Sequence, residues 1–463
     1  MGRKVAIVVG LAAVAFAFLA VFATRHGFFD LKVYYGATNY WAHGHGEIYD
    51  YLKPLSKYGY TYPPFAALTM LPMAVLPWVA TIVISVAATV VVTLVIIKWF
   101  MRPVIDRYRW TPWFTVAVVA VFAAVFEPLR ETVNFGQVNM ILVFLVVADL
   151  IVLVYDRPAA SPGSPSRAWG GVGIGLATAI KLTPGVFILY LLLARKFRAA
   201  AVSIATTAAA TIAAGLVAPH ASRIFWTDAV FDTDRVGSLA YISNQSLKGF
   251  TARLNPAHPN SVVWAVLVLA ALAVWGWQLR RTLRLGDDLA GLALTGAMGC
   301  LVSPVTWVHH LVWLLPAMLL LAGRALLATG RRRIRLSIFT LALYVLLSSK
   351  LVWPYDNHFT GWGMLFSNAY VLATVVLLVC LPLSETTRPA VADATLAAEG
   401  RAESDVPEPE RAGSARTVGV TDLGKLDDAA ADAPHRVGGG RTVGAETQTR
   451  VEPAGGGVRL QYP

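Results

Sequence analysis

The sequence predicts an all-α, polytopic membrane protein, and three properties of the chain support this prediction. Of its 463 residues, 56% are hydrophobic and only 14% are charged, whereas soluble globular proteins carry about 25% charged residues. The mean hydropathy is +0.59. Apolar runs recur over most of the length, as is typical of membrane-spanning helices. The two cysteines, Cys300 and Cys380, lie inside such runs and form neither a metal-binding motif nor a disulfide framework.

The first apolar run, residues 5–23, follows Arg3 and Lys4 and predicts an uncleaved membrane helix. A cleaved signal peptide is the alternative, since Val21-Phe22-Ala23 could serve as a cleavage site, but the run is long for a signal peptide. Further apolar runs predict helices at 78–98, 112–126, 138–155, 169–182, 184–194, 199–217, 260–279, 288–305, 311–328, 334–352 and 365–383.

Basic residues between these runs indicate the topology, because cytoplasmic loops of membrane proteins are rich in Lys and Arg. The segments predicted to be cytoplasmic contain Lys98, Arg102, Arg107 and Arg109; Arg157 and Arg167; Arg195, Lys196 and Arg198; Arg280, Arg281 and Arg284; and Arg324, Arg331, Arg332, Arg333 and Arg335. The segments 24–77, 127–137, 218–259, 303–310 and 353–364 then face outward. This alternation requires that residues 169–194 cross twice or form a re-entrant hairpin, and Pro184 at their middle would break a helix. We therefore expect about twelve transmembrane or re-entrant helices, with both termini cytoplasmic.

The composition divides the chain into a membrane-embedded domain, residues 1–383, and a C-terminal tail, residues 384–463. The tail has nine basic and 13 acidic residues, a net charge of −4, so the rest of the chain carries +16. A segment rich in Ala, Gly, Pro and charge buries too little apolar surface to offset its ordering entropy, which predicts a disordered cytoplasmic tail. Because the basic excess lies in the membrane part, nucleic-acid binding is not expected.

Polar residues in the predicted outer segments are the first candidates for function. Asp30 follows the first span, within FFDLKVYYGA. Tyr60 and Tyr62 lie in YGYTYPPF, where an aromatic belt at the membrane interface is the alternative interpretation. Another outer segment, EPLRETVNFGQVN, contributes Arg130, Gln137 and Asn139, and a hydrogen-bonded turn without a functional role is the alternative there. These three sites are the candidates that come first along the chain.

Two later outer segments and one intramembrane charge complete the candidates. ISNQSLKGFTARL contains Asn244 and Gln245, in a weak match to a glycosylation sequon, followed by Lys248 and Arg253. These two positive charges lie on the side where they are disfavoured, which indicates an anionic ligand or a solvated loop. SPVTWVHHLVW contains His309 and His310; adjacent residues point to different helix faces, so we expect a phosphate or sugar partner rather than a shared metal. Lys181 lies within the apolar run at 169–194.

Six motifs occur in the order DLKVYY, YGYTYPPF, NFGQVN, IKLTP, NQSL and SPVTWVHH. Together, over roughly residues 1–383, they resemble the polyprenol-phosphate-mannose-dependent α-mannosyltransferases of glycosyltransferase family 87, which have the GT-C fold. The resemblance implies a plasma-membrane enzyme with its active site at the outer face, a polyprenyl-phosphate-mannose donor and a lipid-anchored mannoside acceptor. It also implies that Asp30, in its DLxxY context, is the catalytic general base. No cofactor and no metal is expected.

The implied chemistry assigns expected roles to the remaining candidates. An α-linked product, with an α-1,2 linkage expected, formed from a β-linked mannosyl phosphate requires direct displacement, in which a carboxylate takes the proton of the acceptor hydroxyl. Cations and hydrogen-bond donors would stabilise the leaving lipid phosphate, and the candidates are His309, His310, Lys248, Arg253, Arg130 and Lys181. The candidates for substrate contacts are Tyr60, Tyr62, Gln137, Asn139, Asn244 and Gln245. The alternatives are a GT-C transferase that uses another polyprenyl-phosphate sugar, and a transporter or flippase, which should hold polar residues near mid-membrane.

Overall fold

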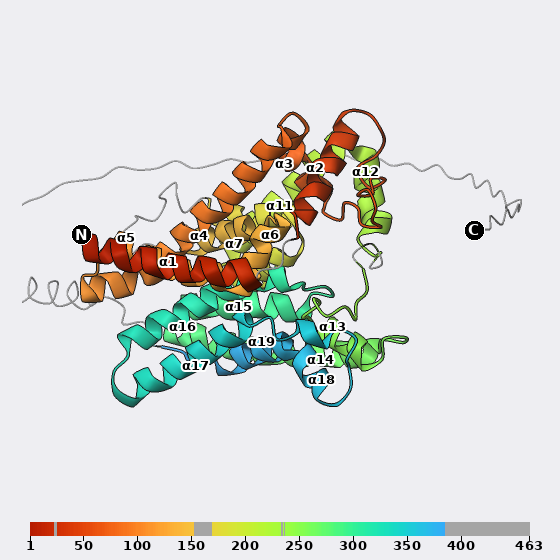
Figure 1. The fold of residues 1–463 in the computed structure, drawn as a ribbon. Helices are drawn as coiled ribbons and strands as arrows, with labels where there is room; N and C mark the ends of the chain where they lie inside the picture. The colour runs from red at the N-terminus through yellow and green to blue at the C-terminus, as the bar shows by residue number, and fades with distance from the viewer. Residues whose placement is uncertain (23–25, 152–168, 233–234, 236, 385–463) are drawn as a thin grey trace, which may run out of the picture. The chain divides into compact units, whose positions relative to one another are not determined.

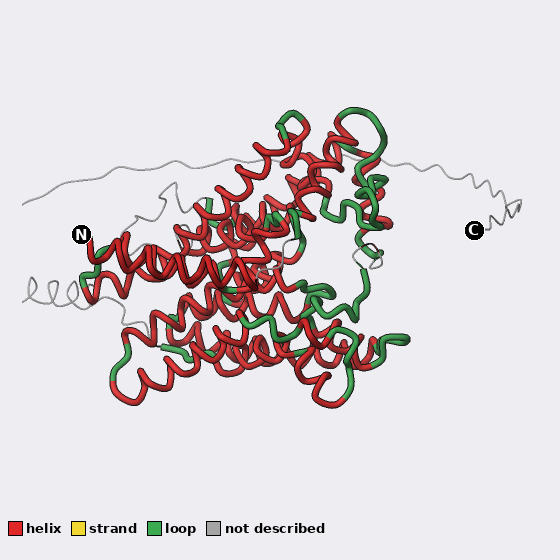
Figure 2. The backbone as a smooth tube through the Cα atoms, in the orientation of Figure 1, coloured by secondary structure: helices red, strands yellow, loops and turns green. Residues whose placement is uncertain are grey.

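The computed structural model describes residues 1–22, 26–151, 169–232, 235 and 237–384, and these residues form helices joined by loops (Figure 2). All of the described residues belong to one compact unit. Apart from Ser384, the predicted tail at 384–463 lies outside the described residues, as does the basic segment with Arg157 and Arg167.

The first two predicted helices are confirmed as α1 (Gly2–Phe22) and α4 (Trp78–Tyr108), and α5 (Pro112–Val125) packs against both of them (Figure 1). Proline precedes α4 and is the first residue of α5, where its fixed φ suits the start of a helix. The predicted outer segment between α1 and α4 contains α2 (Phe29–Ala42), α3 (Pro64–Met70) and the 3₁₀ helix η1 (Leu71–Ala74).

A sharp bend follows α5. Phe126 is extended, and the next helix, α6 (Glu127–Phe135), leaves at 76° to α5. Pro128 has no N–H to continue the hydrogen bonds of α5, which explains the break. Gly136, with a φ of +69°, ends α6 in the left-handed conformation that glycine favours, and α7 (Asn139–Ala148) follows. The predicted outer turn at 127–137 is therefore a short helix.

Residues 169–194 form the predicted hairpin. Its arms are α9 (Val172–Ile180) and α10 (Val186–Leu193), joined through Lys181 and the 3₁₀ helix η3 (Thr183–Gly185). The beginning of α9 and the end of α10 both lie near the start of α11 (Phe197–Val217). Ser203 Oγ of α11 donates to the Gly171 carbonyl, just before α9, at 2.8 Å. Only three residues connect α10 to α11. The arms have nine and eight residues, or about 12–14 Å, less than half of the roughly 30 Å hydrocarbon core. The hairpin is therefore short, with Lys181 near its tip, and its position in the membrane stays a prediction.

The second half of the chain contributes four helices that pack side by side, namely α15, α16, α17 and α19 (Figure 1). Asn260 and Asp287 accept hydrogen bonds from the first N–H groups of α14 and α15, and so cap these helices. The elements after α11 are α12 (Pro219–Ile224), the π-helix η4 (Phe225–Ala229), α13 (Leu247–Leu254), α14 (Ser261–Leu285), α15 (Asp288–Val302), η6 (Val308–Leu314), α16 (Leu315–Leu327), α17 (Gly330–Ser348), η7 (Trp353–Tyr355), α18 (Gly361–Ser367) and α19 (Ala369–Cys380).

Helix lengths confirm a polytopic helical protein. Among the described residues, five helical stretches are long and apolar enough to cross a membrane, and two bent pairs would raise the number to seven. The stretch Val308–Leu327 is 72% buried and Gly2–Phe22 only 6%, so the first is central and the second peripheral. The remaining three of the five stretches are Trp78–Tyr108, Phe197–Val217 and Ser261–Leu285. The number of about twelve transmembrane or re-entrant helices stays a prediction.

Candidate active site

Asp30 lies in the first turn of α2 and is half-buried. Its Oδ2 accepts a hydrogen bond from Gln137 Nε2 at 2.5 Å, while Oδ1 has no hydrogen-bond partner among the described residues. Burial raises the pKa of Asp30 from 3.8 to about 6, against the opposing effects of the Gln137 hydrogen bond and the charges of Lys181 and His26. A carboxylate with a pKa near the working pH and one oxygen available is suited to accept a proton.

The Gln137 side chain connects Asp30 to a pair of tyrosines. Its Oε1 accepts from the Tyr62 hydroxyl at 2.9 Å, so the amide must present its N–H group to Asp30. The Tyr62 hydroxyl in turn accepts from Tyr34 at 2.8 Å and from Lys181 Nζ at 3.2 Å. These bonds fix the orientation of the amide and hold Asp30 Oδ2 as an acceptor.

Lys181, at the hairpin tip, connects the tyrosine pair to Asn139 and His310. Its Nζ lies 3.1 Å from Asn139 Oδ1 and 2.9 Å from His310 Nε2. His310 is oriented by its other ring nitrogen, since Nδ1 accepts from the Trp307 backbone N–H at 3.2 Å. A small cavity of ≈ 20 Å³ adjoins these groups, room for about one water molecule. The residues that line it include Asn139, Lys181, Thr183, Cys300, Thr306 and His310.

Five of the six sequence motifs therefore meet in one hydrogen-bonded network, which contains Asp30, Tyr62, Gln137, Lys181 and His310. Asn139, from the same motif as Gln137, is also part of it. These residues come from α2, the loop before α3, the turn between α6 and α7, the hairpin tip and η6. The structure thus brings together an available carboxylate oxygen, a half-buried amine and an imidazole.

The sixth motif, NQSL, lies outside this network and contacts Thr306, four residues before His310. Asn244 Oδ1 accepts from the Thr306 backbone N–H at 2.9 Å, and the Gln245 backbone N–H donates to the Thr306 carbonyl at 2.7 Å. Both residues are fully buried, and the Gln245 side chain donates to two backbone carbonyls. Asn244 and Gln245 therefore hold the loop that leads to His310, and their predicted contact with substrate stays a prediction.

The other predicted cations lie in different surroundings. Arg253 is buried, and its Nε and Nη2 donate to Asn368 Oδ1 at 2.9 and 2.6 Å, while Nη1 donates to two backbone carbonyls. Lys248 is half-buried beside α14, with Nζ 3.2 Å from Ser261 Oγ and 4.7 Å from the Trp264 ring. These contacts hold Arg253 to Asn368 and to two backbone carbonyls, and they place Lys248 against α14. Neither pattern adds a cation to the network around Asp30.

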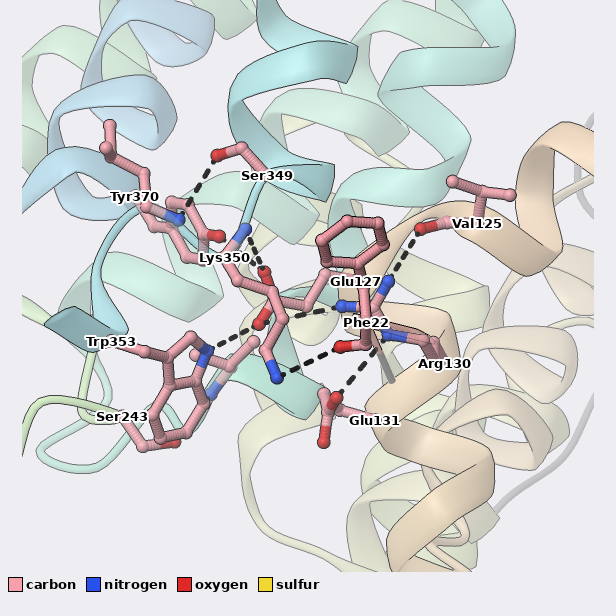
Figure 3. Close-up of polar contacts among 12 residues, drawn as sticks. Phe22, Val125, Glu127, Arg130, Glu131, Ser243, Ser349, Lys350, Trp353 and Tyr370 are labelled. Atoms are coloured by element: carbon pink, nitrogen blue, oxygen red, sulfur yellow. Dashed lines mark hydrogen bonds and ion pairs between the residues drawn. The ribbon is translucent and has the colours of Figure 1, made fainter. Parts of the chain in front are cut away.

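Arg130 belongs to a separate buried cluster of charges. It lies between two carboxylates, with Nη2 4.0 Å from Glu127 Oε1 and Nε 3.6 Å from Glu131 Oε1 (Figure 3). Its Nη1 donates to the Val125 carbonyl at 3.2 Å, at the end of α5. Glu127 also accepts from Trp353 Nε1 at 2.6 Å. The cluster joins the bend after α5 to the last predicted outer loop.

The remaining two candidates border the network. His309 is buried, with its ring 4.6 Å from that of His310 and 4.9 Å from that of Phe135, and its carbonyl accepts from the Thr132 hydroxyl. Tyr60 is fully buried and its ring packs 6.0 Å from that of Tyr62. Both residues therefore pack against members of the network, and the predicted roles of His309 in phosphate binding and of Tyr60 in substrate contact stay predictions.

Two further residues belong to the site, and the sequence had assigned no role to either of them. Tyr34 donates to Tyr62, and its position four residues after Asp30, one helical turn away, is a signal that could have indicated it. His26 lies 2.8 Å from Glu131 and its position just before α2 is the corresponding signal. Within the described ranges, no three His, Cys, Asp or Glu side chains are grouped so that they could hold a metal ion.

Comparison with known proteins adds independent information. The profile described as "Glycosyltransferase family 87" matches residues 60–304. The chain is 33% identical over 346 residues to a "Polyprenol-phosphate-mannose-dependent alpha-(1-2)-phosphatidylinositol mannoside mannosyltransferase" of Mycobacterium tuberculosis, covering 71% of this chain and 77% of the relative. A protein of the same name from Mycolicibacterium smegmatis is 33% identical over 72% of this chain and 78% of its own length. A "Polyprenol-phosphate-mannose-dependent alpha-(1-2)-phosphatidylinositol pentamannoside mannosyltransferase" of that organism is 32% identical over 66% of this chain and 72% of its own. No solved structure matches.

Proposed function

The chain belongs to glycosyltransferase family 87, and from this premise we propose the reaction that it catalyses. It transfers mannose from polyprenyl-phosphate-mannose to a mannosylated lipid acceptor and forms an α-mannosidic, α-1,2 linkage. The observation that carries the proposal is the convergence of five motifs on Asp30, whose Oδ1 is available, beside the amine of Lys181. The names of the relatives supply the class of donor and acceptor.

The geometry divides the work between two groups of residues. The acceptor hydroxyl approaches Asp30 Oδ1 and gives its proton to the carboxylate as its oxygen attacks the anomeric carbon of the donor. The bond from that carbon to the phosphate oxygen breaks on the opposite face, and the polyprenyl phosphate leaves with the electron pair. Lys181 and Asn139 present nitrogen-bound protons beside the site, and with the neighbouring His310 ring they stabilise the charge of the leaving phosphate. Gln137 keeps the other oxygen of Asp30 in place.

We further propose that the site faces the outside and that both termini are cytoplasmic. Arg107, Arg284 and Arg324 lie in the last turns of α4, α14 and α16, and basic residues of this kind gather on the cytoplasmic side. Lys4 contacts Thr111, next to this basic end, which supports a cytoplasmic N-terminus. The Ser384 N–H donates to Asp287 at 2.9 Å at the same end, which supports a cytoplasmic start for the tail.

The test is a transfer assay with the full chain in lipid vesicles. Radiolabelled polyprenyl-phosphate-mannose is supplied with phosphatidylinositol, phosphatidylinositol mannosides of increasing length, and lipomannan fragments. We expect label in a mannosylated lipid, released by an α-1,2-specific mannosidase. Transfer only from a different polyprenyl-phosphate sugar would replace the proposed donor. Movement of intact donor between leaflets without transfer would favour a flippase.

A further inference from the structure

The segment that leads into α2 is anchored to α6 by an ion pair and a stacked ring. His26 Nε2 lies 2.8 Å from Glu131 Oε2, and the His26 side chain is 22% exposed while that of Glu131 is 1% exposed. The His26 ring also stacks on Phe135, with centroids 4.1 Å apart and planes at 22°. Asp30 follows His26 by only four residues. A change at His26 is therefore transmitted to the start of α2 over a very short distance along the chain.

The backbone between His26 and Asp30 is held in an uncommon conformation. Gly27 and Phe28 both have positive φ, +58° and +57°, and a bulky residue rarely adopts this conformation. Such a conformation persists only where the surroundings fix it. Here the Phe28 N–H donates to the Asn134 carbonyl of α6 at 2.9 Å. The turn into α2 is thus specified by α6 on both sides, through His26 and through Phe28.

The charges around Glu131 show how His26 is held there. Glu131 and Glu127 are both buried carboxylates, and Arg130 lies between them (Figure 3). Glu127 is also held by Trp353 Nε1 at 2.6 Å, whereas Glu131 is approached from outside α6 by His26. The contact with Glu131 therefore holds the His26 ring against α6, four residues before Asp30.

We propose that His26 is a positioning residue for mannose transfer, which fixes the turn that carries Asp30 and whose positive charge stabilises the ionised Asp30 carboxylate. This inference rests on the proposed role of Asp30 as the general base. The observation that supports it is the set of contacts between α6 and the turn. The charge of His26 also acts to lower the pKa of Asp30, in the same direction as the charge of Lys181. The groups that face this pair are Glu131 and Arg130 from α6, Lys181 from the hairpin, His309 from η6, Tyr34 from α2 and Tyr62 from the loop before α3.

The test compares pH–rate profiles of the wild type and three variants in the vesicle assay. His26→Gln removes the charge, and we expect the acidic limb of kcat to move upward by about half a pH unit or more, with the KM for the donor within about twofold of the wild-type value. His26→Arg retains a positive charge beside Glu131 and should restore much of the wild-type limb. The matched control is His220→Gln, because His220 pairs with Glu47 at 3.3 Å but is 65% exposed. It should leave the profile unchanged.

The outcomes separate this inference from the proposed function. If His26→Gln lowers kcat equally at all pH values and the limb does not move, His26 has only a structural role and the inference is wrong. If His26→Gln does not fold, His26→Tyr is the second uncharged variant, because it keeps a ring that can stack on Phe135, and its limb must move upward. Absence of transfer by the wild type would overturn the proposed function and this inference together, whereas an active wild type with an unmoved limb in His26→Gln would overturn this inference alone.

Discussion

Lowering the pH from about 7.5 to about 5 is expected to slow the transfer reaction about tenfold, because Asp30 must be ionised to act as the base. Burial raises the pKa of Asp30 to about 6. The ionised fraction is then about 97% at the higher pH and about 9% at the lower one. A carboxyl with an ordinary pKa near 3.8 would remain more than about 90% ionised at both, so its rate would hardly change.

The assay for this prediction is single-turnover transfer at saturating donor, with unfolding at each pH followed on the same samples. A single ionisation should account for the acidic limb, with a midpoint near the raised pKa of Asp30. A rate that changes less than about twofold over this range, in protein that stays folded, would refute the assignment of Asp30 or its environment. A loss of rate that follows unfolding would have no bearing on Asp30, which is why both are recorded.

The same raised pKa has a consequence for stability. The folded state favours the protonated form of Asp30, so this group contributes stability that is full below about pH 4 and is lost as the pH rises through about 6. At neutral pH the ionised Asp30 carboxylate therefore lowers the free energy of unfolding. We expect Asp30→Asn to stabilise the protein by about 1 kcal/mol at about pH 7.5, measured as a rise in Tm, and to make no such difference at about pH 4. A lower Tm at neutral pH would contradict this reasoning.

Three further predictions follow from individual contacts. Gly136→Ala, at a φ of +69° and with its new Cβ 2.5 Å from Leu31 Cβ, should destabilise the fold by about 1–3 kcal/mol and lower kcat, as Tm and turnover will test. Gln137→Leu removes a hydrogen bond to ionised Asp30, so the acidic limb should move upward and kcat should fall about tenfold; an unchanged limb would contradict this. Arg253→Ala should cost about 2–4 kcal/mol of stability through its lost buried hydrogen bonds, whereas Lys248→Ala should change neither Tm nor donor KM. A tenfold rise in donor KM in Lys248→Ala would place the phosphate site there instead.

The sequence was most informative where a local rule determines the structure. Apolar runs predicted the helices because a membrane helix satisfies all of its own backbone hydrogen bonds. Pro184 predicted the break in the hairpin because proline cannot continue a helix, and the structure has η3 there. The ordered motifs also predicted that Asp30, Gln137 and Lys181 share a function, and these residues do share one network.

The sequence was least informative where the partner of a side chain is distant along the chain. Arg253 was a candidate for phosphate binding, yet Asn368, 115 residues away, accepts two of its hydrogen bonds. The outer turn predicted at 127–137 is the helix α6, which follows the bend at Phe126. This helix carries Glu131, which contacts His26. The sequence around a charged residue in a predicted outer segment looks the same whether its side chain binds a ligand or other side chains of the protein.

The most direct test of the central claim is transfer by Asp30→Asn beside the wild type, with donor binding measured separately in the same vesicles. The change is nearly isosteric and removes the proton-accepting charge, while Lys181, Asn139 and His310 remain in place for the phosphate. The account predicts that the variant binds polyprenyl-phosphate-mannose like the wild type and transfers mannose at least about a hundredfold more slowly. Turnover near the wild-type rate would show that another group takes the proton and would contradict the account.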